Sequence, residues 1–361
     1  MPLSSTTQLE QVRDLRIAQA VPLQTPALVF EELPLDQARA ETVLQGRADI
    51  ARILDRTDDR LLVVVGPCSV HDARAALDYA QRLSAVAAEL HEDLCVAMRV
   101  YFEKPRTTTG WKGMINDPHL DGSYDVNTGL RLARKLLLEV VELGLAVGCE
   151  FLDPITPQYI SDAVAWGAIG ARTTESQIHR QLASGLSMPV GFKNRTDGNI
   201  GVAVDAVRAA AARHAFAGID VNGTPAILHT RGNLDCHVIL RGGHGAPNYG
   251  AATVQAALEM LDSAGLQKRL IIDASHDNSG KDPARQPLAV ADVAEQLAAG
   301  NGAIVGMMLE SFLVEGRQGL GSGAPLTYGQ SITDACMAWE ETQEVLEQLA
   351  TAVRDRRRSV G

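Results

Sequence analysis

Apolar and polar residues along this chain fall into alternating blocks that predict strands and helices in turn. Five consecutive apolar residues at 61–65 end at a Gly-Pro pair, which is typical of a strand buried on both faces of a parallel sheet. Seven further apolar runs follow, so the pattern predicts eight strands near 61–66, 95–101, 145–150, 166–171, 189–193, 236–241, 269–273 and 302–309.

Stretches rich in Ala, Leu, Arg and Glu separate these strands and predict helices at 74–90, 127–143, 157–165, 176–184, 200–212, 251–264, 286–299 and 330–353. Eight strands that are each followed by a helix predict an α/β fold of the (β/α)₈ TIM barrel type. An open, doubly wound sheet is the alternative, but no Gly-x-Gly-x-x-Gly sequence follows the first strand.

Two segments lie outside this alternation. Residues 1–45 are polar and interrupted by prolines, which predicts an N-terminal extension with a subunit-contact or regulatory role ahead of a catalytic barrel at 46–361. A helix is expected at about 38–55. Asn222-Gly223 lies between two alternating runs and predicts a β-hairpin, so residues 214–232 are an insertion before the sixth strand.

Composition excludes several classes of protein. The chain has 361 residues, 46% of them hydrophobic, and a net charge of −11, which argues against a nucleic-acid partner. No apolar run approaches the roughly 18 residues of a membrane span, and the acidic N-terminus is not a signal peptide. Five cysteines, an odd number without paired spacing, indicate a reducing cytoplasm.

Polar residues at the predicted strand ends form two chemical sets, which a barrel would gather at one rim. The first set is cationic: Arg99, Lys104, Arg106, Arg172, Lys193 and Arg241. Six converging cations would repel each other without an anionic ligand, unless each pairs with a local acid. The set therefore indicates two phosphorylated substrates, or one phosphate and one ligand with both carboxylate and phosphate.

The second set combines soft and hard metal ligands: Cys68, His276, Glu310 and Asp334. A thiolate, an imidazole and two carboxylates are suited to a divalent transition metal. No two of them share a short motif, and each has an ordinary structural alternative, so the metal site depends on the barrel bringing them together.

Several motifs carry a resemblance to a known family. They are GPCS at 66–69, RVYFEKPRTT at 99–108, GARTTES at 170–176, GFKN at 191–194, ILRGG at 239–243 and DAC at 334–336. From about residue 40 to its end, the chain resembles the class I, metal-dependent 3-deoxy-D-arabino-heptulosonate 7-phosphate (DAHP) synthases that aromatic amino acids regulate by feedback.

The resemblance implies a condensation of phosphoenolpyruvate with erythrose 4-phosphate and water, the first step of the shikimate pathway, in a homodimer or homotetramer. It implies that Cys68, His276, Glu310 and Asp334 bind manganese, iron, cobalt or zinc. It assigns phosphoenolpyruvate to Arg99, Lys104, Arg172, Lys193, Arg241 and the backbone of Ala171, and the phosphate of erythrose 4-phosphate to Pro105, Arg106 and Thr107.

Catalytic and regulatory roles complete these expectations. Lys104 and Glu150 are the candidates for proton transfer, and neighbouring cations are expected to lower the pKa of Lys104. Ser187 and Gly218 fall at positions that resemble the family's inhibitor site. Glycine at 218 leaves room for a hydroxyl, which favours tyrosine as the inhibitor.

The chain departs from the family pattern at a few places. Arg195 replaces a usual glycine, Asp277 replaces a usual small residue and is expected to tune His276, and the loop after Gly243 is one residue longer. Two alternatives remain. A 3-deoxy-octulosonate 8-phosphate synthase typically has Asn where this chain has Arg106, and a non-catalytic amino-acid-binding subunit would not need all the metal ligands and cations.

Overall fold

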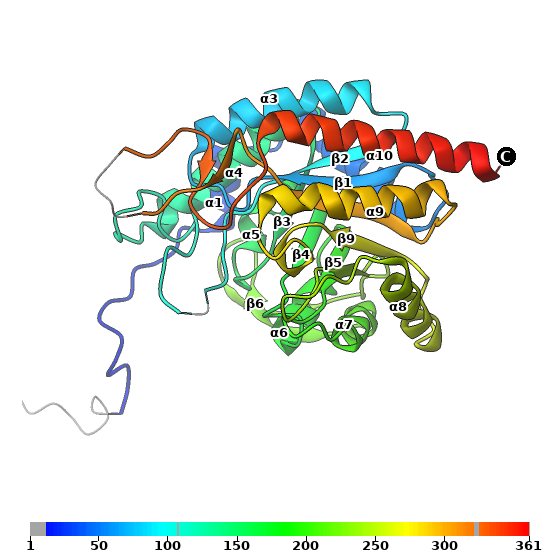
Figure 1. Cartoon of the computed structure of the whole chain (residues 1–361). Coiled ribbons are helices and arrows are strands. Elements are labelled where there is room, and N and C mark those ends of the chain that lie inside the picture. The colour runs from blue at the N-terminus through cyan, green and yellow to red at the C-terminus, as the bar shows by residue number, and fades with distance from the viewer. Residues whose placement is uncertain (1–11, 107, 321–324, 361) are drawn as a thin grey trace, which may run out of the picture.

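The strands close into a single parallel barrel. The computed structural model describes residues 12–106, 108–320 and 325–360. Its barrel has the strand order β1-β10-β9-β8-β5-β4-β3-β2, which confirms the predicted TIM barrel (Figure 1). The strands are β1 (Leu61–Gly66), β2 (Leu94–Arg99), β3 (Ala146–Glu150), β4 (Trp166–Ile169), β5 (Val190–Lys193), β8 (His237–Leu240), β9 (Leu270–Asp273) and β10 (Ile304–Glu310).

Burial and register explain why the polar strand ends meet. Every residue of β1 and β10 is buried, as their continuous apolar runs require. Gly66 pairs with Glu310, and Met308 pairs with Asp273 on the next strand. The carboxyl ends of these parallel strands therefore lie at one rim of the barrel.

Helices surround the barrel in the expected alternation. They are α3 (Ala73–Glu89), α4 (Val126–Glu142), α5 (Pro157–Ile160), α6 (Gln177–Ala183), α7 (Gly201–Ala211), α8 (Ala251–Ser263), α9 (Gln286–Ala298) and α10 (Trp339–Val360), with 3₁₀ turns η1 (Ser161–Ala163), η2 (His276–Asn278) and η3 (Pro283–Arg285). Asp72 caps α3 and Asp125 caps α4 by accepting backbone N–H bonds.

Two predicted helix bounds were wrong. The helix expected at 157–165 ends at Ile160 and continues only as η1. The last helix begins at Trp339 and not at 330, because Gln330–Ser331 form strand β12 beside β11 (Val314–Arg317). The connection from β12 to α10 carries Asp334 to the barrel rim.

The helix predicted at about 38–55 is confirmed, and a further helix that was not predicted precedes it in the N-terminal extension. Helix α1 (Pro26–Glu32) begins after the N-cap Thr25, and α2 (Gln37–Leu54) follows. The buried Arg134 of α4 donates to the Leu33 carbonyl and pairs with Asp162, so it fastens the end of α1 to the barrel wall. The chain before Pro22 extends away from the barrel (Figure 1), whereas Pro22 and Gln24 bond to Asn127 of α4.

The predicted hairpin is confirmed. Strands β6 (Ala215–Ile219) and β7 (Pro225–His229) pair in antiparallel fashion ahead of β8. The turn places Gly223 at φ +73°, where glycine is favoured. Within the described residues, no helix has the length and apolar character needed to cross a membrane.

Candidate active site

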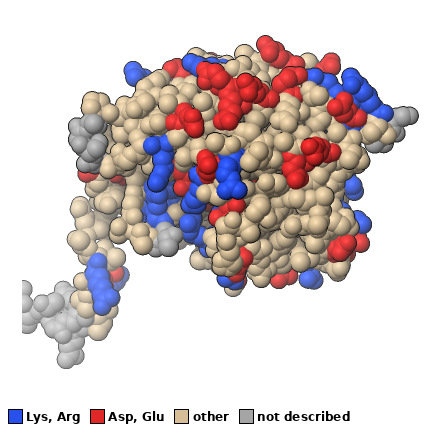
Figure 2. All heavy atoms as spheres, viewed as in Figure 1, with Lys and Arg blue, Asp and Glu red and all other residues tan. Residues whose placement is uncertain are grey.

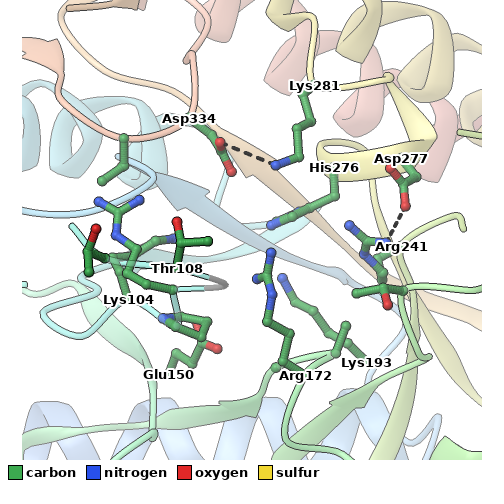
Figure 3. Close-up of a pocket in the computed structure, with 17 residues that line it drawn as sticks. Lys104, Thr108, Glu150, Arg172, Lys193, Arg241, His276, Asp277, Lys281 and Asp334 are labelled. Atoms are coloured by element: carbon green, nitrogen blue, oxygen red, sulfur yellow. Dashed lines mark hydrogen bonds and ion pairs between the residues drawn. The ribbon is translucent and has the colours of Figure 1, made fainter. Parts of the chain in front are cut away.

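A cavity of about 420 Å³ opens at the carboxyl ends of the strands. Figure 3 shows its charged residues converging from several loops, and Figure 2 shows Lys and Arg side chains gathered in a hollow of the face drawn. Of the site residues predicted from the sequence, ten line it: Lys104, Pro105, Arg106, Glu150, Ala171, Arg172, Lys193, Arg241, His276 and Asp334. Thr107 lies outside the described residues.

The predicted metal ligands lie together at one end of this cavity. Ligand atoms of Cys68, Glu310 and Asp334 lie within 4.8 Å of one another. His276 completes the group from η2, with Nε2 3.9 Å from a carboxylate oxygen of Glu310. Burial and Glu310 raise the pKa of the Cys68 thiol above its usual value. A thiol sulfur, an imidazole nitrogen and two carboxylates form a donor set that fits a divalent transition metal.

Arg99 is buried and does not line the cavity. Its guanidinium donates to the Pro67 and Cys68 carbonyls and pairs with Glu310 at 2.9 Å. The ring of Tyr101 lies against it, with the guanidinium carbon 3.5 Å from the ring centroid. Arg99 therefore holds the loop of Cys68 and the carboxylate of Glu310 in place.

Lys104 contacts the same thiol. Its Nζ lies 3.2 Å from Cys68 Sγ and 3.2 Å from the Cys68 carbonyl oxygen. Burial and Arg99 act to lower the pKa of Lys104, but Cys68, Glu310 and Glu150 outweigh them and raise it. The expected lowering of this pKa was wrong, because the sequence could not show that anions surround the amine.

Two of the predicted cavity cations, Lys193 and Arg241, have acidic partners of their own. Lys193 Nζ lies 2.8 Å from Asp273, whose side chain is fully buried. Arg241 pairs with Asp277 (Figure 3), so the departure at 277 acts on Arg241 rather than on His276. Gly242 allows this arrangement, because a Cβ there would meet the backbone N of Asn278 at 2.6 Å.

Arg172 projects into the cavity from the loop after β4 (Figure 3). No Asp or Glu among the described residues lies within ion-pair distance of it. Glu150 lies on the same side of the cavity, and it needs the adjacent glycine, since a Cβ at Gly170 would meet its Oε1 at 2.2 Å. Arg195 pairs with Glu175 and Asp197 and so ties the loop after β5 to the loop after β4.

Comparison with known proteins identifies the family. A family model described as the DAHP synthetase I family matches residues 36–347. This chain belongs to that family. The Phe-sensitive phospho-2-dehydro-3-deoxyheptonate aldolase of Escherichia coli strain K12 is 56% identical over 344 residues, which cover 95% of this chain and 98% of the relative.

Other members of the DAHP synthetase I family are nearly as similar. The tyrosine-inhibited phospho-2-dehydro-3-deoxyheptonate aldolase of Schizosaccharomyces pombe is 48% identical over 363 residues, covering 99% of this chain and 98% of the relative. A solved structure of the aldolase from Francisella tularensis SCHU S4 has a TM-score of 0.92 and 49% identity, covering 94% of this chain and 99% of that chain. The expected family, enzyme class and condensation of phosphoenolpyruvate with erythrose 4-phosphate are confirmed.

Two residues received no role from the sequence: Asp273, buried beside the cavity, and Lys281, which lines it. Asp273 ends β9 directly after a buried apolar run, and this abrupt change from apolar to acidic was a signal that could have found it. Lys281 extends toward Asp334, with its Nζ 3.5 Å from a carboxylate oxygen (Figure 3). No spacing or motif in the sequence pointed to Lys281.

A second cavity, of about 570 Å³, lies between α5, the end of α6 and the β6–β7 hairpin. Ser187 and Leu228 are among its lining residues. Gly218 does not line it, but a Cβ at 218 would meet Leu228 Cδ1 at 2.7 Å. Position 218 therefore touches this cavity through Leu228.

Proposed function

We propose that the rim cavity condenses phosphoenolpyruvate with erythrose 4-phosphate and water, and releases DAHP and inorganic phosphate. The observation that carries this proposal is the cluster of Cys68, Glu310 and Asp334, within 4.8 Å of one another, beside a cavity lined by cations. An alkene phosphate and an aldehyde phosphate need both features: cations for the phosphates and an electrophilic centre for the aldehyde.

Phosphoenolpyruvate binds where Arg172, Lys193 and Arg241 face one another across the cavity. These cations hold its phosphate and carboxylate, with the backbone of Ala171 beside them. This position turns C3 of the enol phosphate toward the aldehyde carbon. The activation barrier is then lower, because the reacting atoms are already aligned. Pro105 and Arg106 receive the phosphate of erythrose 4-phosphate at the other end.

Proton transfer falls to Lys104 and Glu150. A new carbon–carbon bond forms between C3 and the aldehyde carbon, and the aldehyde oxygen takes a proton. Lys104 is placed for this step because its Nζ lies 3.2 Å from Cys68 Sγ, beside the cluster. Water then adds to C2, Glu150 accepts its proton, and the C–O bond to phosphate breaks.

A divalent ion, manganese, iron, cobalt or zinc, would be held by Cys68, His276, Glu310 and Asp334. When bound, it supplies Lewis-acid polarisation of the aldehyde oxygen. Three of these donors lie within 4.8 Å of one another, and His276 Nε2 lies 3.9 Å from Glu310, which supports this assignment.

One assay tests the proposal. Purified full-length protein is incubated with phosphoenolpyruvate and either erythrose 4-phosphate or arabinose 5-phosphate, with and without a chelator, and released phosphate is measured. We expect release only with erythrose 4-phosphate, loss of activity with chelator, and recovery with added Mn²⁺. Phosphate release with arabinose 5-phosphate but not with erythrose 4-phosphate would refute the proposed reaction. An absence of release with both aldoses would refute it as well.

The second cavity supports feedback inhibition by an aromatic amino acid, and we propose tyrosine. Its lining combines apolar side chains with hydroxyls, including Leu228, Ser187 and Thr230, which suits an aromatic ring with a polar group. Inhibition by phenylalanine, with none by tyrosine, would reject this choice.

We also propose that the chain acts as a homo-oligomer in the cytoplasm. Segment 12–25 carries exposed apolar residues, among them Val12, Leu15 and Ile17, which are 79%, 71% and 61% exposed. A second copy of the chain would cover them. All five cysteines are free and buried, in keeping with a reducing compartment. Deleting residues 1–21 should reduce the number of subunits per particle, which light scattering measures as the particle mass divided by the chain mass.

A further inference from the structure

Asp273 lies between the cations and the metal ligands and has no assigned role. It is the last residue of β9, after the buried Leu270, and its side chain is fully buried. One carboxylate oxygen, Oδ2, lies 2.8 Å from Lys193 Nζ and 2.9 Å from His276 Nδ1. The Lys193 amine forms an ion pair with this oxygen and His276 Nδ1 faces it, so the two cavity residues share one carboxylate.

The surroundings of His276 determine which ring nitrogen is available to a metal. Nδ1 faces Asp273 Oδ2 and lies 2.7 Å from Ser275 Oγ. The Ser275 hydroxyl donates its own hydrogen to Asp273 Oδ1 at 2.7 Å, so both neighbours of Nδ1 are acceptors. The hydrogen therefore sits on Nδ1, and Nε2 presents its lone pair toward the side of Glu310.

The backbone holds the ring in this position. His276 has φ +58°, a left-handed conformation that is uncommon for residues other than glycine. Asn278 fixes the turn by donating to the carbonyls of Asp273 and Leu240 at 2.7 and 3.1 Å. A conformation of this kind persists only where the surrounding structure enforces it, which is frequent at functional sites.

We propose that Asp273 is a positioning residue that couples metal binding at His276 to phosphoenolpyruvate binding at Lys193. A cation on Nε2 polarises the imidazole and so strengthens the electrostatic attraction between Nδ1–H and Asp273 Oδ2. Less of the carboxylate charge then neutralises Lys193, whose amine binds the substrate phosphate more tightly. Substrate binding has the same effect in the other direction. The substrate phosphate attracts Lys193, so more of the Asp273 charge acts on His276 and makes its ring a better metal ligand.

Because the interior screens charge poorly, redistribution of one buried charge between two partners 2.8 and 2.9 Å away changes both affinities. By linkage, the factor by which the metal tightens the substrate equals the factor by which the substrate tightens the metal. The inference rests on the proposed function only for the identity of the two ligands.

Calorimetry on the full-length, metal-free protein tests the coupling. The Kd for Mn²⁺ is measured with and without phosphoenolpyruvate, and the Kd for phosphoenolpyruvate with and without Mn²⁺. We expect each ligand to tighten the other by at least about fivefold in the wild type. In Asp273→Asn we expect Mn²⁺ to bind about 10–100-fold more weakly and the coupling factor to fall to near one.

A matched control removes a carboxylate from an ion pair at the opposite end of the barrel. Asp55 pairs with the buried Arg269 at 2.8 Å, just before β9 begins. Asp55→Asn should leave both affinities and their coupling unchanged. A coupling factor in Asp273→Asn equal to that of the wild type would overturn the proposal, even if both affinities fell.

A second variant covers the case in which Asp273→Asn does not fold. Lys193→Met removes the competing partner, so Mn²⁺ should bind this variant without substrate at least as tightly as it binds the wild type. Weaker Mn²⁺ binding would overturn the proposal, because it would give Lys193 a purely structural role. Product formation by the wild type is measured separately, so a protein that couples the ligands without making DAHP refutes only the proposed function.

Discussion

A buried histidine at the amino end of the barrel predicts how acid destabilises the fold. His237 begins β8, and Trp166 begins β4; the two side chains are 2% and 0% exposed. His237 Nδ1–H donates to the Asp235 carbonyl at 3.1 Å, and Nε2 accepts from Trp166 Nε1–H at 3.2 Å. An indole nitrogen can only donate, so a proton added to Nε2 would face another hydrogen.

The pKa of His237 follows from this environment. Burial lowers it from the ordinary 6.5 to about 3, because the charged ring would lose its water, while the Asp235 carbonyl opposes the shift only in part. The unfolded chain takes up a proton below pH 6.5 and the folded chain does not. Stability from this residue is therefore present above pH 6.5 and falls with decreasing pH down to about 3.

The expected size of the effect is about 1.4 kcal/mol per pH unit, or about 2 kcal/mol between pH 7 and pH 5. His237→Gln keeps an acceptor for Trp166 and removes the titration. We expect the unfolding free energy of the wild type to fall by about 2 kcal/mol more than that of the variant over this range. Urea unfolding followed by circular dichroism at fixed protein concentration measures the difference.

The comparison of slopes does not depend on the intrinsic cost of the substitution, which is the same at every pH. His91→Gln, at an exposed ring, is the control and should retain the pH dependence of the wild type. If wild type and His237→Gln lose stability in parallel from pH 7 to pH 5, the argument that His237 stays neutral in the fold is wrong.

Three further substitutions have expected outcomes. Gly218→Ser should weaken tyrosine inhibition at least fivefold, because its Cβ would crowd Leu228 at 2.7 Å and overpacking costs about 1–3 kcal/mol; inhibition curves that match the wild type would contradict this. Asp277→Asn should lower the KM for phosphoenolpyruvate by up to about fivefold, since it frees Arg241, and a raised KM would refute that reasoning. Arg134→Met should cost about 3 kcal/mol in urea unfolding and speed chymotrypsin cleavage after Phe30 of α1, whose ring lies against the Arg134 guanidinium. Unchanged cleavage would show that α1 does not depend on Arg134.

The barrel could be predicted from the sequence because each strand is a short, continuous apolar run that ends at a polar residue. In β10, for instance, seven buried residues end at Glu310, and the opposing strand ends at Gly66. The same reasoning placed most of the cavity residues at one rim, since parallel strands share a direction. A local signal also exists for α1, where Thr25 caps a helix that begins with proline.

What the sequence could not show was which charges face each other. Whether Lys104 meets cations or anions depends on side-chain direction across loops far apart in the chain, and the structure surrounds it with Cys68, Glu310 and Glu150. The start of the last helix was misjudged for a related reason. Residues 330–331 pair with β11, and a long-range strand pairing overrides local helix preference.

The pairing of charges also changes how the cationic cavity should be understood. Six converging cations were expected to need an anionic ligand to offset their repulsion, yet Arg99, Lys193 and Arg241 each have a carboxylate of their own: Glu310, Asp273 and Asp277. Arg172 has no such carboxylate among the described residues, but at Lys193 and Arg241 an arriving phosphate would exchange for an internal anion rather than neutralise an unpaired charge. Such an exchange lowers the net affinity for substrate, because the protein's own ion pairs must weaken. It also couples each substrate contact to the other residues that the same carboxylate contacts. Glu310 is itself a candidate metal ligand and Asp273 Oδ2 lies 2.9 Å from His276 Nδ1, so the proposed coupling predicts that anion binding at the cations is transmitted to the metal cluster.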